Sequence, residues 1–237
     1  MIKYILALVV SGLLFSSAQA EPVFIGTGFF INGSGYLVTA AHVIRDNDHL
    51  TVVYKGVEVP ATVVSVDNED DTAILHIDVN NRTWFTLLRH PVDKDNVLIL
   101  GFPMPEIFGF DLKVSKAVLN TSNDFSDDEQ IYGISCPGNS GGPVLDYYGD
   151  VVGILVSGYD NPAFEGTPLE GCGTHDQARP LDGIIRQAHD NNVNITVTDY
   201  RLFPLDMNQV LTTIVNDDTV VLVVNFPKKE ALISPDK

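Results

Sequence analysis

The chain has 237 residues, with 14 lysines and arginines against 31 aspartates and glutamates, and a formal net charge of −17. This acidic balance argues against binding to nucleic acid or to an anionic membrane surface, because both need basic patches on the protein. The length is within the range of one large all-β domain or two small ones, and it allows a substantial buried core.

The first residues have the pattern of an export signal. Lys3 precedes an apolar run at residues 4–15, and a stretch of small residues ends at Ala20. This order indicates a secretory signal peptide over residues 1–20, with cleavage after Ala20. The apolar run is short for a bilayer span, so we expect no membrane anchor after cleavage, an uncleaved anchor being the alternative. The expected location is the periplasm or the extracellular medium.

Beyond the signal, short β-type runs follow one another between turn residues. One helix is expected near residues 180–190, where Ile184, Ile185 and Ala188 have helical spacing. Many short strands with little helix predict an all-β sandwich or barrel. Two more strand-like runs predict that residues 191–237 form a β-type C-terminal extension, packed on the main domain at residues 21–190. The strand-like runs of the main domain are GTGFFI, GYLVTA, LTVVYKG, VEVPATVVSV, DTAILHI, NVLILGF, LKVSKAVLN, QIYGIS and GPVLDYYGDVVGILVS.

Three stretches carry side chains suited to nucleophilic catalysis. His42 follows a β run in GYLVTAAHVI, Asp71 precedes one in NEDDTAILHI, and Ser140 lies in CPGNSGGPVLD. A serine hydroxyl needs an imidazole to accept its proton, and the imidazole needs a carboxylate to orient it. Adjacent Asp70 is an alternative to Asp71. The alternative for Ser140 is that its cluster of small residues marks only a tight turn.

Together these stretches resemble trypsin-like serine peptidases, especially the compact bacterial HtrA-like branch. That family carries its base in T-x-A-H, its acid in D-x-A-x-L and its nucleophile in G-[DN]-S-G-G-P, in the same chain order. The resemblance covers about residues 25–190. It implies two antiparallel, six-stranded β-barrels, with a boundary near residues 85–100 and an active cleft between them. The tail is too short for the PDZ module that is typical of HtrA proteins.

The resemblance also assigns roles around Ser140. It implies that the N–H groups of Gly138 and Ser140 form the oxyanion hole, an important source of catalytic stabilisation. It pairs Cys136 with Cys172, the two cysteines of the chain, in a disulfide that would stabilise the fold by about 3–4 kcal/mol. Asn139 stands where digestive relatives carry an aspartate that binds a newly released N-terminal amine. We therefore expect no activating cleavage beyond removal of the signal.

The expected substrate is a protein or peptide. By resemblance Ile134 lies at the base of the primary pocket, and it cannot compensate the desolvation of a cation. We therefore expect cleavage after small or medium apolar residues. Val156, Ser157 and Gly158 are expected to pair with extended substrate as an added strand.

The sequence thus predicts a secreted or periplasmic serine endopeptidase that uses a His42–Asp71–Ser140 triad and an acyl-enzyme. No metal or organic cofactor is implied, since the chain has no H-E-x-x-H motif and no cluster of cysteine and histidine. The alternative is a non-catalytic homologue of the same fold that binds peptides or proteins.

Overall fold

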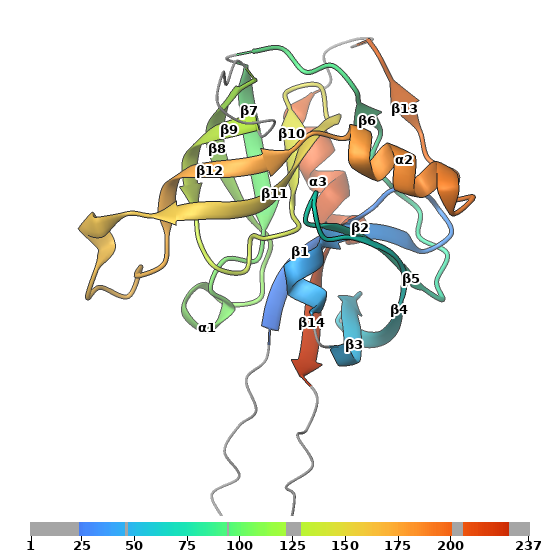
Figure 1. The fold of residues 1–237 in the computed structure, drawn as a ribbon, viewed down its shortest axis with the longest axis horizontal. Coiled ribbons are helices and arrows are strands. Elements are labelled where there is room, and N and C mark those ends of the chain that lie inside the picture. Colours follow the sequence, from blue (N-terminus) through green and yellow to red (C-terminus); the bar gives the residue numbers. More distant parts are fainter. Residues whose placement is uncertain (1–23, 46, 94, 122–128, 201–205, 228–237) are drawn as a thin grey trace, which may run out of the picture.

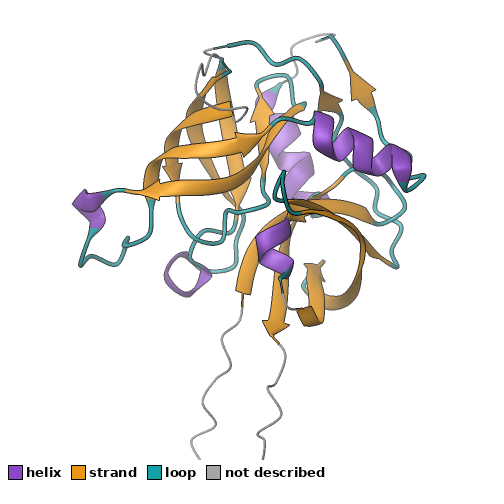
Figure 2. Ribbon diagram, in the orientation of Figure 1, coloured by secondary structure: helices purple, strands orange, loops and turns teal. Residues whose placement is uncertain are grey.

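A computed structural model of the chain describes residues 24–45, 47–93, 95–121, 129–200 and 206–227 (Figure 1). The expected signal peptide at residues 1–20 and its cleavage site after Ala20 lie outside these residues. Strands dominate the described chain and the helices are short (Figure 2), which confirms the predicted all-β class. Within the described ranges, no helix is long and apolar enough to span a membrane.

Six antiparallel strands close the first barrel in the order β1-β14-β3-β4-β5-β2. Its interior is filled with aliphatic and aromatic side chains, and the rings of Phe30 and Tyr54 pack edge to face with centroids 5.5 Å apart. Such pairs add to the stabilisation that burial alone gives. The strands are β1 (Phe24–Phe30), β2 (Tyr36–Ala40), β3 (Asn47–Tyr54), β4 (Val57–Asp67), β5 (Thr72–Ile77) and β14 (Val220–Pro227).

The strand β14 comes from the C-terminal tail but lies inside this barrel. It pairs with β1 from Phe24 opposite Asn225 to Phe29 opposite Val220, and its other edge pairs with β3. Figure 1 shows the three strands side by side. The valine-rich strand is almost entirely buried, as expected where both faces of a strand are covered. The tail therefore supplies one wall of the first barrel.

The second barrel follows almost directly along the chain. Its strands have the order β10-β7-β8-β9-β12-β11, and pairing of β10 with β11 closes it. Outside the barrel, the short strand β6 (Leu87–Leu88) pairs in parallel with the start of β11, and β13 (Val197–Thr198) pairs in parallel with β6. The six barrel strands are β7 (Asn96–Gly101), β8 (Lys113–Asn120), β9 (Glu129–Ser135), β10 (Pro143–Asp146), β11 (Val151–Asp160) and β12 (Gly173–Arg179).

Short helices cover the barrels. The helix expected near residues 180–190 is α2 (Asp182–Asp190), which buries Ile184 and Ala188. The Nε2 group of Gln187 donates to Oγ1 of Thr72 at 2.7 Å and so ties α2 to the first barrel. The tail is not entirely β, because it also contains α3 (Met207–Asp217). The remaining helical turns are η1 (Ala41–Ile44), α1 (Pro105–Phe108) and η2 (Pro162–Phe164).

Candidate active site

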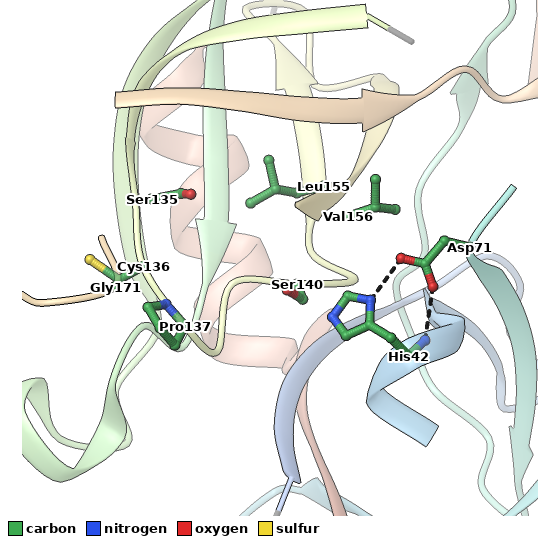
Figure 3. A pocket seen from close by; sticks show the side chains of 9 residues that line it. All are labelled: His42, Asp71, Ser135, Cys136, Pro137, Ser140, Leu155, Val156 and Gly171. Atoms are coloured by element: carbon green, nitrogen blue, oxygen red, sulfur yellow. Dashed lines mark hydrogen bonds and ion pairs between the residues drawn. The ribbon is translucent and has the colours of Figure 1, made fainter. Parts of the chain in front are cut away.

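The two barrels bring together the three side chains singled out in the sequence. His42 lies on η1, directly after β2, and Asp71 lies directly before β5. Because β2 and β5 are antiparallel neighbours with Ala40 opposite Thr72, the end of one strand meets the start of the other. Ser140 comes from the second barrel, in the loop between β9 and β10. All three side chains line one pocket (Figure 3).

Asp71 holds the imidazole of His42 through two contacts. Nδ1 of His42 lies 2.7 Å from Oδ2 of Asp71, and the backbone N–H of His42 donates to Oδ1 at 2.9 Å. Asp71 has a left-handed backbone with φ 50°, a conformation that aspartate tolerates better than most residues. With Nδ1 bound to the carboxylate, Nε2 of a neutral ring is left as a proton acceptor. In Figure 3, Ser140 lies on the opposite side of the ring from Asp71.

Asp70, the other candidate acid, points elsewhere. Its Oδ2 lies 3.3 Å from Nη2 of Arg186 on α2, and its side chain packs against Gly183. Asp70 does not line the pocket that contains His42. The structure therefore brings Asp71, rather than Asp70, to the imidazole.

The loop of Ser140 is pressed against the first barrel. The carbonyl of Ser140 accepts the N–H of Thr27 at 2.8 Å. Gly141 has φ +84°, and a Cβ there would lie 2.3 Å from both the carbonyl oxygen of Thr27 and Oγ1 of Thr39. Only glycine can adopt this backbone conformation in so little space. The cluster of small residues is thus a tight turn, and that turn fixes the position of the serine.

A second tight turn, at residues 136–139, precedes the serine. The N–H of Asn139 donates to the carbonyl of Cys136 at 3.0 Å, and Gly138 at the third position has φ +99°. Positive φ at the third position, with Pro137 at the second, is typical of a type II turn. The hydroxyl of Thr27 donates to the carbonyl of Gly138 at 2.7 Å and fixes the end of the turn.

The orientation of this turn leaves two N–H groups available. The carbonyl of Pro137 accepts the N–H of Met104 at 2.7 Å. The N–H of Gly138 belongs to the same trans peptide plane, so it points the opposite way. Among the residues that the structure describes, neither this N–H nor that of Ser140 has an acceptor. Two such donors beside a serine are suited to a developing negative charge.

Cys136 and Cys172 form a disulfide bond between residues 36 positions apart in the sequence. The bond ties the loop of Ser140 to the segment that leads into β12. Cys136 and Gly171 both line the pocket, and Cys172 is fully buried. The disulfide therefore forms part of the pocket wall.

The pocket has a volume of about 430 Å³ and extends from His42 toward the second barrel. Ile134, expected at its base, is 54 % exposed and does not line it. Ser135 lines it instead, because successive side chains of β9 point to opposite faces. The sequence analysis expected an apolar base at Ile134, whereas the structure has Ser135, the next residue of β9, in the lining of the pocket.

The strand β11 forms another side of the pocket. Leu155 and Val156 line it, and Ser157 and Gly158 follow in the same strand. One edge of β11 pairs with β12, whereas the other pairs with β10 only as far as Ile154. No described strand covers that second edge at residues 156–158. The backbone is therefore available there to an added strand.

Two residues that the sequence analysis did not select support the site. Thr27 contacts both turns of the serine loop, and its place between two glycines is a signal of close backbone approach that could have marked it. Asn225 on β14 is fully buried, and its Nδ2 donates to the carbonyls of Val43 and Arg45 at 3.1 and 2.8 Å. These carbonyls lie one and three residues after His42. No pattern in the sequence indicates this contact.

Two antiparallel barrels, with a His–Asp pair from the first and a serine followed by two glycines from the second, define the class of double-barrel serine peptidases. The chain belongs to the trypsin-like peptidase family, since the family model for the trypsin-like peptidase domain matches residues 26–154. In the described ranges, no group of three or more histidine, cysteine, aspartate or glutamate side chains is arranged to hold a metal ion.

The chain is also similar to curated bacterial proteins. It is 32 % identical over 153 residues to a probable periplasmic serine endoprotease, DegP-like, of Chlamydia pneumoniae, covering 59 % of this chain and 30 % of that protein. It is 31 % identical over 139 residues to the uncharacterized protein y4bJ of Sinorhizobium fredii, covering 57 % of this chain and 22 % of that one. The chain thus spans less than a third of the length of these relatives.

Solved structures agree with the HtrA-like resemblance. The HtrA-type protease AlgW, solved with a decapeptide, is 26 % identical with a TM-score of 0.60, over 70 % of this chain and 51 % of that one. The serine endoprotease of Yersinia pestis is 26 % identical with a TM-score of 0.57, over 71 % and 57 % of the two chains.

Proposed function

We propose that this protein is an exported serine endopeptidase that cleaves peptide bonds through an acyl-enzyme. The observation that carries the proposal is one pocket lined by the His42–Asp71 pair and Ser140, next to a serine loop in which the N–H groups of Gly138 and Ser140 are available. Family membership and the DegP-like relatives support the same class of reaction. Each of these groups then has a role in the reaction.

In the first half of the reaction, Oγ of Ser140 attacks the carbonyl carbon of the scissile bond. Nε2 of His42 takes the hydroxyl proton, and Asp71 stabilises the resulting imidazolium. The carbonyl oxygen becomes negative and accepts hydrogen bonds from the N–H groups of Gly138 and Ser140. Collapse breaks the C–N bond, and His42 returns its proton to the leaving amine. Water attacks the acyl-enzyme by the same steps and releases the carboxylic acid.

Substrate binds as an extended strand along the free edge of β11 at residues 156–158. Main-chain hydrogen bonds in this mode give affinity, while side-chain pockets give specificity. The side chain before the scissile bond enters the pocket and packs its aliphatic part against Leu155 and Val156. These apolar walls favour cleavage after small or medium apolar residues, which is the expectation from the sequence, although Ile134 is not one of them.

The protein acts after export, in the periplasm or the medium. The charged, apolar and small-residue order of the first twenty residues supports this, as do the names of the periplasmic relatives. Sequencing the N-terminus of the exported protein checks the proposal, with Glu21 the expected first residue. A chain that starts at Met1 and fractionates with membranes would contradict it.

No further cleavage is needed for activity. Asn139 is buried, with 3 % exposure, and packs against Gly101. A neutral amide there cannot form the ion pair with a new amine that activates digestive relatives. Exported protein should react at once with an active-site probe, and a requirement for a second N-terminal cut would contradict this.

A fluorophosphonate probe tests the catalytic proposal, since it reacts only with an activated serine. We expect labelling of the wild type, none of Ser140→Ala, and normal labelling of the matched control Ser115→Ala on β8. Peptide cleavage should follow the same order. Folded wild-type protein that is neither labelled nor active would favour the alternative, a non-catalytic peptide-binding homologue.

A further inference from the structure

Thr27 is a side chain of the first barrel that is enclosed by the second. It lies on β1 and is fully buried. A Cβ at Gly101, the last residue of β7, would lie 2.8 Å from Oγ1 of Thr27. A Cβ at Gly142, directly before β10, would lie 3.3 Å from its Cγ2. Glycine at these two positions therefore leaves the room that Thr27 occupies.

The hydroxyl of Thr27 uses both its donor and its acceptor capacity. It accepts the N–H of Phe102 at 3.2 Å and donates to the carbonyl of Gly138 at 2.7 Å. A threonine hydroxyl has a single hydrogen, so these two contacts fix its direction toward Gly138. Because Thr27 is buried, bulk water does not compete for this hydrogen bond.

The four carbonyls of residues 137–140 are each held by a hydrogen bond. Three of the donors are backbone N–H groups, whereas the donor to the carbonyl of Gly138 is the hydroxyl of Thr27. The orientation of the Gly138 carbonyl thus depends on a side chain. The backbone donors are Met104 to Pro137, Gly142 to Asn139 and Thr27 to Ser140.

The carbonyl of Gly138 lies in the peptide plane between the two available N–H groups. The N–H of Gly138 belongs to the plane before it, and the N–H of Ser140 belongs to the plane after it. Peptide planes are rigid, so rotation of the middle plane turns the two N–H groups relative to each other. Gly138 has no Cβ to resist such a rotation. The N–H of Asn139 is held within the turn by Cys136, and Thr27 holds the same plane from outside the turn.

We propose that Thr27 is a positioning residue for the oxyanion hole. Its hydroxyl fixes the peptide plane between the two N–H donors and so sets the angle at which they converge on the carbonyl oxygen of the substrate. This alignment acts mainly in the transition state, where the negative charge develops. The first barrel would then supply part of the oxyanion hole as well as the base. The inference rests on the proposed endopeptidase function and adds a residue to it.

Substitution of Thr27 separates the hydroxyl from the shape of the side chain. Thr27→Val keeps the shape and removes the donor, so we expect kcat to fall by roughly tenfold or more while KM changes by less than about twofold. The pH dependence of kcat/KM should keep its midpoint, because the hydroxyl bonds to Gly138 and Phe102 rather than to the His42–Asp71 pair. Thr27→Ser keeps the hydroxyl and should hold kcat within about threefold of wild type.

The matched control is Thr219→Val, at the start of β14. Thr219 is also buried, and its hydroxyl bonds to Oγ1 of Thr83. This substitution removes a buried hydroxyl of the first barrel away from the serine loop, and kcat should stay at the wild-type value.

A peptide aldehyde tests the oxyanion hole without turnover. Oγ of Ser140 adds to the aldehyde carbon, its proton passes to His42, and the former carbonyl oxygen becomes the oxyanion. The inhibition constant should therefore weaken in Thr27→Val by about the same factor as kcat/KM. The matching peptide alcohol, which cannot form the adduct, should bind both proteins equally.

An unchanged kcat in folded Thr27→Val, a loss confined to KM, or an equal loss in Thr27→Ser would overturn the inference and leave the endopeptidase intact. Thr27→Ala, compared with Thr27→Ser, repeats the test if the valine variant does not fold. If neither hydroxyl-free variant folded, Thr27 would be a structural residue and the positioning role would be rejected. Wild-type protein without fluorophosphonate labelling or cleavage would instead reject the proposed function.

Discussion

The two barrels divide the site between them, and they are built in different ways. The second barrel uses six strands from one continuous stretch, β7 to β12, and a disulfide closes its serine loop. The first barrel is closed by β14, which lies more than a hundred residues from β5 along the chain. The walls of the pocket that β9 and β11 supply therefore depend on contacts within one segment, whereas the His42–Asp71 pair depends on the C-terminal tail. The following predictions test this difference.

The largest effect is expected for a charge in the wall that β14 supplies. Val223 is fully buried between β1 and β3, so Val223→Asp should destabilise the first barrel by more than about 4 kcal/mol and abolish fluorophosphonate labelling. Thermal unfolding and labelling check this. The control Val114→Asp places the same charge on the exposed face of β8. Equal effects of the two substitutions would contradict the dependence on β14.

Loss of the disulfide should affect the second barrel. The double variant Cys136→Ser with Cys172→Ser removes a covalent link between residues 36 positions apart. It should lower the free energy of unfolding by about 3–4 kcal/mol. Denaturant unfolding with and without reductant measures it. Wild type in reductant should match the double variant, and the variant itself should not respond to reductant.

Asp176 should make the stability of the second barrel depend on pH. Its pKa is raised by burial from 3.8 to about 6, so the folded state holds the proton more tightly than the unfolded chain. Its contribution to stability therefore falls as pH rises from about 4 to about 6, and the ionised carboxylate costs about 3 kcal/mol above that range. Asp176→Asn should raise the free energy of unfolding at about pH 8 by up to this amount and change little near pH 3.5.

The matched control is Asp111→Asn, an exposed aspartate just before β8. Denaturant unfolding at the two pH values should show no such difference for this variant. If Asp176→Asn were as stable as wild type at both pH values, the buried carboxylate would have to be stabilised by its surroundings.

The smallest effect is expected for Asn225, which links β14 to the loop after His42. Asn225→Ala removes its hydrogen bonds to the carbonyls of Val43 and Arg45. Stability should fall by about 1–2 kcal/mol, and kcat by roughly tenfold with little change in KM, since the imidazole is less well placed. Asn208→Ala, on the exposed side of α3, is the control. An unchanged kcat would show that this loop keeps its position without β14.

The fold class could be predicted from sequence because short β runs and turn residues are local signals. The stretches around His42, Asp71 and Ser140 could be found because each is a local motif in a known chain order. The lining of the pocket was harder to predict from the sequence, because a shift of one residue along a strand moves the side chain to the opposite face. That shift is the difference between Ile134, the expected residue, and Ser135, the observed one. Asn225 and Asp176 act through pairings between distant strands, which no periodicity reveals. In α3, the β-branched residues Val210, Thr212 and Thr213 weaken the helical signal.

The position of β14 also determines the order in which the two halves of the site can form during synthesis. Residues 96–179 leave the ribosome, and in an exported chain enter the new compartment, before residues 220–227 do. Until then β1 and β3 each lack a neighbour, and the loop of His42 lacks the hydrogen bonds of Asn225. The half of the site that carries the nucleophile can thus form before the half that activates it. A nascent or interrupted chain has the serine loop and the β9 and β11 walls of the pocket, but the loop of the base, His42, gains its hydrogen bonds from Asn225 only when the tail arrives.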